Sequence, residues 1–164
     1  MDAVLERARR IRLLVLDVDG VLTDGRLFIS PAGEEFKVFH VRDGSGLVAL
    51  QRSGVAVAII SGRDSEAVSR RAGELGIRHV RQGVADKARE LEALMRELDL
   101  RPEETACVGD DTPDLPMLEA AGLAVAVADA HPALRSAAHW VTAAAGGRGA
   151  VREVCDLLLS AAQH

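Results

Sequence analysis

The stretch LLVLDVDGVLTDG, residues 13–25, carries four aliphatic residues that lead directly into two carboxylates, Asp17 and Asp19. The apolar run at 11–17, followed by a glycine-containing turn, predicts a buried strand. Burial and a neighbouring negative charge both raise the pKa of a carboxyl group. Two carboxylates at the end of a buried strand therefore need a compensating positive charge, and the stretch predicts a polar site there.

Outward from this stretch, apolar runs and helical patterns alternate along the chain. Further strands are expected at 55–62, 77–83, 105–111, 123–127 and 139–142, and helices at 46–54, 64–76, 85–100, 112–122, 131–138 and 149–163. Continuous apolar strands between helices are typical of a parallel sheet covered on both faces, with right-handed connections. We therefore expect an α/β fold in a single domain that covers residues 1–164.

One segment breaks this alternation. Residues 25–41, GRLFISPAGEEFKVFHV, alternate apolar and polar positions on both sides of SPAG, which predicts a β-hairpin. The hairpin follows the acidic pair, so we expect it to overhang the site as a flap. Its expected exposed apolar side chains are Leu27, Phe28, Ile29, Phe36, Val38 and Phe39. Such a patch usually marks an interface, so hairpins of several subunits are expected to pack together.

Composition excludes several classes of function. The formal net charge of −5 argues against a nucleic-acid partner. The sequence contains no apolar run of about 18 residues, so we expect no membrane span. The segment MDAVLERARRIR has no apolar signal core, so we expect a cytoplasmic protein. Cys107 and Cys155 both lie in apolar runs and are expected to be buried free thiols.

Polar chemistry follows four of the expected strands. Asp17 and Asp19 follow the first, SGR at 61–63 the second, Lys87 opens the helix after the third, and Asp110, Asp111 and Asp114 follow the fourth. Ligands of open α/β sheets bind beyond the carboxyl ends of the strands. Carboxylates from two strands at one edge favour a hard divalent cation, and we expect Mg²⁺. Single aspartates such as Asp24, Asp43, Asp64 and Asp129 are interpreted as caps or turn formers.

These motifs carry a family resemblance. DVDGVLTDG, ISGR, Lys87 and GDDTPD match, in order and spacing, the four motifs of the haloacid dehalogenase superfamily of phosphotransferases. GEEFKVFHVRDGSGL, AIISGRDS, VAVADAHP and GGRGAVREVCDLLL extend the resemblance, from about Ile11 to Leu159, to the 3-deoxy-D-manno-octulosonate 8-phosphate phosphatases. The resemblance implies a Rossmann-like sheet without a large cap domain, a Mg²⁺ cofactor and a homotetramer. The implied activity is Mg²⁺-dependent hydrolysis of that sugar-acid phosphate, in lipopolysaccharide biosynthesis.

The resemblance also implies roles for individual residues. Asp17 would be the nucleophile that forms an aspartyl-phosphate, and Asp19 the general acid and then the general base. Lys87 would balance the negative charge. The metal would take the carboxylates of Asp17 and Asp110 and the backbone carbonyl of Asp19; either Asp111 or Asp114 could support that shell.

Four further residues are expected to bind the substrate. Ser61 and the Gly62 backbone N–H would hold a phosphoryl oxygen, and Arg63 and Arg42 the carboxylate or hydroxyls of the sugar acid. Arg148, in GGRG, is equally consistent with an anion site and with a glycine-rich turn.

Three alternatives stay open at this point. A phosphoacceptor receiver domain also combines clustered aspartates, a Ser or Thr and a Lys, but it has no counterpart to Asp19, and its Lys follows the last motif strands. A non-catalytic scaffold domain could lose catalytic positions, whereas this chain keeps all of them. A 9-phosphate phosphatase of nine-carbon sugar acids differs only in substrate, and the VRDG loop favours the eight-carbon acid by resemblance.

Overall fold

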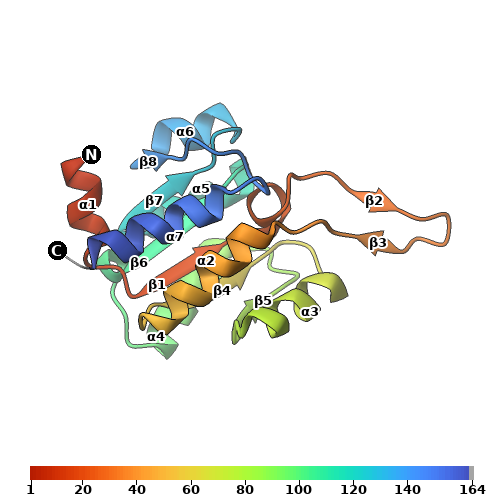
Figure 1. The fold of residues 1–164 in the computed structure, drawn as a ribbon, viewed down its shortest axis with the longest axis horizontal. Coiled ribbons are helices and arrows are strands. Elements are labelled where there is room, and N and C mark those ends of the chain that lie inside the picture. Colours follow the sequence, from red (N-terminus) through yellow and green to blue (C-terminus); the bar gives the residue numbers. More distant parts are fainter. Residues whose placement is uncertain (163–164) are drawn as a thin grey trace.

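The computed structural model describes residues 1–162 and contains a six-stranded sheet in the order β5-β4-β1-β6-β7-β8 (Figure 1). Every neighbouring pair in this sheet is parallel. Its strands are Leu13–Leu16 (β1), Ala56–Ile60 (β4), His79–Arg81 (β5), Thr105–Gly109 (β6), Leu123–Ala126 (β7) and Trp140–Val141 (β8). The predicted parallel α/β sheet is confirmed.

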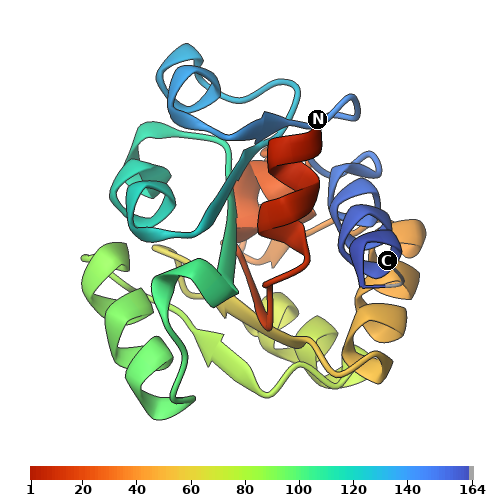
Figure 2. The ribbon, with the colours of Figure 1, turned by 90° about the vertical axis from the view of Figure 1, so that its left-hand side faces the viewer.

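Helices cover both faces of the sheet, as predicted. They are Asp2–Ala8 (α1), Val41–Arg52 (α2), Glu66–Leu75 (α3), Lys87–Glu97 (α4), Leu115–Ala120 (α5), Pro132–Ala137 (α6) and Ala150–Ala161 (α7). Figure 2 shows α2 and α7 packed together on one side, with α4 and α5 on the other. Because both faces are covered, all four residues of β1 are fully buried, which accounts for its unbroken aliphatic sequence.

The position of β1 brings the predicted site together. Leu13 pairs with Ala56 of β4 on one side and with Thr105 of β6 on the other. The three strands run parallel, so their carboxyl ends meet at one edge. The chain leaves β1 towards β4 and returns later to β6, so this edge is also the point where the strand order reverses.

Two helices differ from the sequence prediction. Helix α1 was not predicted; its Val4 and Ala8 are buried in the core. Helix α2 begins at Val41 instead of near residue 46, because the Nδ1 atom of His40 accepts from Arg42 N (3.2 Å) and caps it. Gly44 and Gly46, among the first six residues of α2, weaken the helical signal; Gly46 lies where α2 packs closely on α7, and a Cβ there would lie 3.1 Å from Cys155 Cβ.

The hairpin exists but its ladder is short. Phe28–Ile29 (β2) and Glu35–Phe36 (β3) pair antiparallel, with Phe28 opposite Phe36, and the ribbon projects from the body of the molecule (Figure 1). Residues 37–40 leave the ladder and lead into α2. The expectation that Phe39 is exposed is wrong, because Phe39 packs against the core.

Three smaller expectations have an outcome in the described residues. Both cysteines are buried and free. No helix within residues 1–162 is long and apolar enough to cross a membrane. The last helix, expected at 149–163, is observed as Ala150–Ala161, and position 163 lies outside the described residues.

Candidate active site

Gly20 leaves room for the side chain of Asp110 to lie close to Asp17. Asp17 follows β1, and its backbone N–H donates to Val108 O at 3.3 Å, so the loops after β1 and β6 start side by side. Gly20 lies in the turn Val18–Leu22 with φ of +88°, and a Cβ on it would lie 1.8 Å from Asp110 Oδ2. Only glycine therefore combines this backbone conformation with the close approach of Asp110.

Lys87 joins the loops after β1 and β6. Its Nζ donates to Asp17 Oδ1 at 2.9 Å and to Asp114 Oδ1 at 2.5 Å, and all three side chains are buried. Burial lowers the pKa of Lys87, but the two carboxylates raise it more, so the ammonium is retained. The N-terminal residue of α4 thus supplies the positive charge that the opening stretch requires.

Asp114 is the acidic residue that organises the loop after β6. Its Oδ2 accepts from Asp110 N (3.0 Å) and Asp111 N (3.4 Å), while its Oδ1 accepts from Lys87. Asp111 is exposed and accepts from Thr112 N at 2.7 Å. Of the two residues that the sequence left open, only Asp114 lies in the buried cluster.

The cluster concentrates negative charge. Asp17, Asp110 and Asp114 each offer one oxygen within 4.8 Å of the others. Burial, followed by Asp114, raises the pKa of Asp17 to about 6, with Lys87 opposing the shift. Burial, followed by Asp17 and Asp114, raises the pKa of Asp110 to about 9. One lysine does not neutralise three carboxylates, so the cluster favours a further cation.

The predicted phosphate-binding residues line the same cavity. Ser61, Gly62 and Arg63 follow β4 and border a cavity of about 360 Å³ that also includes Asp17, Asp19, Lys87 and Asp110. Ser61 is 2% exposed; its N–H donates to Arg81 O at 2.9 Å, and its carbonyl accepts from Val84 N at 3.0 Å. These backbone bonds fix the loop that faces Asp17 across the cavity.

Lys37 was missed by the sequence analysis. Its side chain is 2% exposed, and its Nζ donates to Asp19 Oδ1 (2.7 Å) and Glu35 Oε1 (2.8 Å). Arg63 lies 3.0 Å from Glu35 Oε2 and 3.6 Å from Asp19 Oδ2. The available signal was a single basic residue in the apolar segment FKVFHV, which did not indicate a partner eighteen residues earlier.

Arg42 and Arg148 do not border this cavity. Arg42 is exposed in the first turn of α2, and Arg148 is exposed beside Asp24, with 3.7 Å between Nη2 and Oδ2. A substrate role for Arg42 stays a prediction. The pairing of Arg148 favours a structural role at the glycine-rich turn.

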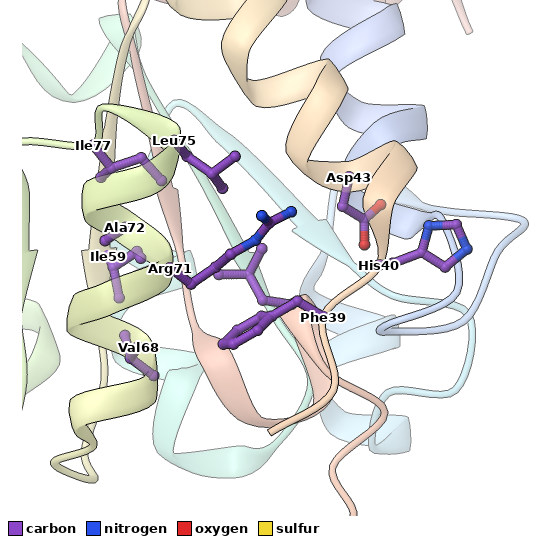
Figure 3. A pocket seen from close by; sticks show the side chains of 10 residues that line it. Phe39, His40, Asp43, Ile59, Val68, Arg71, Ala72, Leu75 and Ile77 are labelled. Carbon is purple, nitrogen blue, oxygen red and sulfur yellow. The ribbon is translucent and has the colours of Figure 1, made fainter. Parts of the chain in front are cut away.

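A second, mostly apolar pocket lies between α2 and α3 (Figure 3). Phe39 lines it together with Val68 and Leu75. Asp43, at its edge, is 1% exposed, and its Oδ1 accepts from Arg152 N at 2.9 Å. Asp43 is a cap, as expected, but it caps the first turn of α7 and so locks α2 onto α7.

Comparison with known proteins identifies the family. Residues 79–153 match the haloacid dehalogenase-like hydrolase family. Over 98% of its length the chain is 51% identical to the 3-deoxy-D-manno-octulosonate 8-phosphate phosphatase KdsC of Yersinia pestis, of which it covers 86%. The chain belongs to the family of 3-deoxy-D-manno-octulosonate 8-phosphate phosphatases. This membership excludes the receiver-domain alternative.

Solved structures of this phosphatase family share the fold. The Yersinia pestis phosphatase has a TM-score of 0.97 at 51% identity, with 99% of this chain and 88% of that one covered. The Moraxella catarrhalis phosphatase, solved with magnesium, phosphate and a KDO molecule, has a TM-score of 0.98 at 43% identity, with 99% and 94% covered. The protein is therefore a phosphatase of the haloacid dehalogenase superfamily.

The residues present fit the metal that the phosphatase family implies. All three donors in the cluster are carboxylate oxygens, the hard ligands that Mg²⁺ prefers. The raised pKa values of Asp17 and Asp110 show that this cluster is poorly balanced with Lys87 alone. A divalent cation beside these oxygens would favour their ionised forms.

Proposed function

We propose that this protein is a Mg²⁺-dependent phosphomonoesterase that hydrolyses 3-deoxy-D-manno-octulosonate 8-phosphate. The observation that carries the proposal is the buried carboxylate of Asp17, hydrogen-bonded to Lys87 and facing a cavity that also includes Ser61 and Gly62. A carboxylate nucleophile, a fixed cation and a phosphate-holding loop are what transfer of a phosphoryl group to an aspartate requires.

The reaction has two steps. An oxygen of Asp17 attacks phosphorus, the bond from phosphorus to the sugar oxygen breaks, and that oxygen takes a proton from Asp19. Water then attacks the phosphorus of the aspartyl-phosphate, giving up a proton to Asp19, and inorganic phosphate leaves as the Asp17 carboxylate reforms. Asp19 is placed for both proton transfers because it lines the same cavity as Asp17.

The remaining residues supply charge and position. Mg²⁺, held by the carboxylates of Asp17 and Asp110 and the backbone carbonyl of Asp19, would neutralise charge on the phosphoryl oxygens when bound. Asp114 supports this shell, because it fixes the Asp110 backbone and Lys87 at once. Ser61 and Gly62 hold a phosphoryl oxygen, and Lys87 balances the charge on Asp17.

Two arginines are assigned to the sugar acid. Arg63 borders the cavity and is half exposed; its guanidinium pairs with Glu35, and a carboxylate or hydroxyls of the substrate would compete for it. Arg42 lies outside the cavity of its own chain, so any contact with a substrate would be made across a subunit interface. We propose the eight-carbon acid as the substrate, in preference to nine-carbon acids, because the similar protein from Yersinia pestis is named as a phosphatase of the eight-carbon acid.

We also propose a cytoplasmic homotetramer built through the hairpins. The exposed large apolar side chains of the hairpin region are Leu27, Phe28, Ile29, Phe36, Val38 and Val41. Their exposed fractions range from 43% to 79%, and side chains of this size gathered on one projecting ribbon usually mark an interface. Neighbouring hairpins would then close each cavity in place of a cap domain and exclude water.

A phosphate-release assay tests this function. Eight-carbon and nine-carbon sugar-acid phosphates are compared in Mg²⁺ and in excess chelator. We expect the highest kcat/KM on 3-deoxy-D-manno-octulosonate 8-phosphate, no turnover in chelator, and recovery on adding Mg²⁺. Asp110→Ala should raise the Mg²⁺ concentration needed, whereas Glu119→Ala, an exposed acid on α5, should not. Full activity in chelator, or a preference for nine-carbon acids, would contradict the proposal.

A further inference from the structure

The ion pairs around Asp19 form a closed ring that includes the hairpin. Lys37 bridges Asp19 and Glu35 at 2.7 and 2.8 Å, and Arg63 contacts the second oxygen of each carboxylate. Two members of this ring belong to β3 and the segment after it, one to the loop after β1 and one to the loop after β4. The ring therefore fastens the base of the hairpin to two loops of the catalytic cavity.

Lys37 is the buried member of the ring. Its side chain is 2% exposed, against 22% for Asp19 and 50% for Arg63. An ammonium group taken out of water is costly unless it is paired, and both of its described acceptors are carboxylates. Burial lowers the pKa of Lys37, but Asp19 and Glu35 raise it more, so the positive charge is held in place.

Among the described residues, Asp19 is the member of the cavity lining that Lys37 contacts directly. Asp19 borders the cavity and Lys37 does not. The two catalytic carboxylates thus have separate lysines: Lys87 from α4 holds Asp17, and Lys37 from the hairpin holds Asp19. When a substrate enters the cavity, Oδ1 of Asp19 is already bound by Lys37.

We propose that Lys37 is a positioning residue: it holds the Asp19 side chain by Oδ1, so that the other carboxyl oxygen, Oδ2, carries the proton that passes to the departing sugar oxygen. This inference rests on the proposed role of Asp19 as the general acid. By this inference the hairpin acts on the catalytic cavity of its own subunit, independently of any contact between subunits. The lysine forms no bond with the substrate and takes no part in the proton transfer itself.

The leaving group distinguishes positioning of an acid from general support of the fold. An alkoxide leaves slowly unless it is protonated, whereas p-nitrophenolate leaves readily without a proton. We compare kcat/KM on 3-deoxy-D-manno-octulosonate 8-phosphate and on p-nitrophenyl phosphate, because this ratio reports the steps up to phosphoryl transfer. Lys37→Met should lower kcat/KM on the sugar phosphate by about 100-fold, which is the scale of general acid catalysis. It should lower kcat/KM on p-nitrophenyl phosphate by less than about threefold.

Three variants complete the test. Lys37→Arg, which keeps a cation, should recover most of the loss on the sugar phosphate. Arg26→Met removes one positive charge from the same hairpin without touching Asp19, and it should leave both substrates unaffected. Asp19→Asn should show the same dependence on leaving group as Lys37→Met. Circular dichroism establishes that each variant is folded, and Lys37→Gln replaces Lys37→Met if the latter is not.

The outcomes separate the two hypotheses. If Asp19→Asn impairs the sugar phosphate selectively and the Lys37 variants impair both substrates equally, or neither, the positioning role is overturned and the general acid stands. If Asp19→Asn shows no selectivity, the proposed acid itself is wrong, and the role of Lys37 is overturned with it. Selective loss in both, with recovery in Lys37→Arg, supports the inference.

Discussion

The ammonium group of Lys87 lies 2.9 Å from Oδ1 of Asp17, although 70 residues separate the two in the chain. The sheet order makes this contact: Asp17 follows β1 in the middle of the sheet, and Lys87 is the first residue of α4, which begins after β5 at the same carboxyl edge. The pair holds the buried carboxylate of Asp17, the proposed nucleophile, beside its counter-charge before any ligand binds. Preorganisation of this kind lowers the barrier to phosphoryl transfer, because no charge has to be moved into place during the reaction.

The acidic cluster predicts a pH-dependent stability of the metal-free protein. The pKa of Asp110 is raised from 3.8 to about 9, so the folded state keeps a proton that the unfolded state loses. The resulting stabilisation is complete below about pH 4 and is lost as the pH rises towards 9. In chelator, thermal melts should therefore show a falling melting temperature between pH 6 and pH 8.

Asp110→Asn isolates this effect. The amide cannot ionise, so the variant should melt above the wild type at pH 8 in chelator and close to it at pH 4. Mg²⁺ should stabilise the wild type at pH 8 and stabilise the variant much less. If the melting temperatures of wild type and variant change equally with pH across this range, the raised pKa of Asp110 is contradicted.

Gly20→Ala should impair the site far more than an equivalent change elsewhere. A Cβ at Gly20 would lie 1.8 Å from Asp110 Oδ2, and the φ of +88° adds strain of about 1–3 kcal/mol for any other residue. We expect a fall in kcat/KM of at least about tenfold and a higher Mg²⁺ requirement. Gly54→Ala is the matched control: its φ is +97°, but nothing lies within 4 Å, so activity should persist. Equal losses in the two variants would show that strain alone accounts for the effect.

The hairpin predicts the state of assembly. Ile29 is 64% exposed on β2, so Ile29→Asp should disrupt contacts between subunits without disturbing the core. Phe39 is unsuitable for this test because it packs against the core. Light scattering should give a mass near four chains for the wild type and smaller species for the variant, with a higher KM. A wild-type monomer with full activity would refute the tetramer.

The fold and the main cluster were accessible from sequence for a simple reason. Aliphatic runs such as LLVL require a sheet buried on both faces, and the polar residues directly after the runs must then meet at one edge. Asp17, Asp110 and Lys87 were therefore predictable as neighbours.

Contacts that depend on side-chain direction were not accessible in this way. The burial of Phe39 and the Lys37–Asp19 pair both arise where the chain turns out of the hairpin ladder into α2, and alternation alone does not place that turn. The choice of Asp114 over Asp111 likewise depends on a loop in which Asp114 folds back onto Lys87.

The most direct test of the account is to trap the phosphoryl group on Asp17. Asp19→Asn lacks the base for the second step, so reaction with p-nitrophenyl phosphate and Mg²⁺, followed by acid quench, should leave phosphorylated enzyme. Mass spectrometry should place one phosphoryl group on Asp17, and the double variant Asp17→Asn, Asp19→Asn should carry none. In turnover, Asp17→Asn alone should retain less than about a hundredth of wild-type activity. Phosphate release with no label on Asp17 at any quench time, or a label on another residue, would contradict covalent catalysis by Asp17.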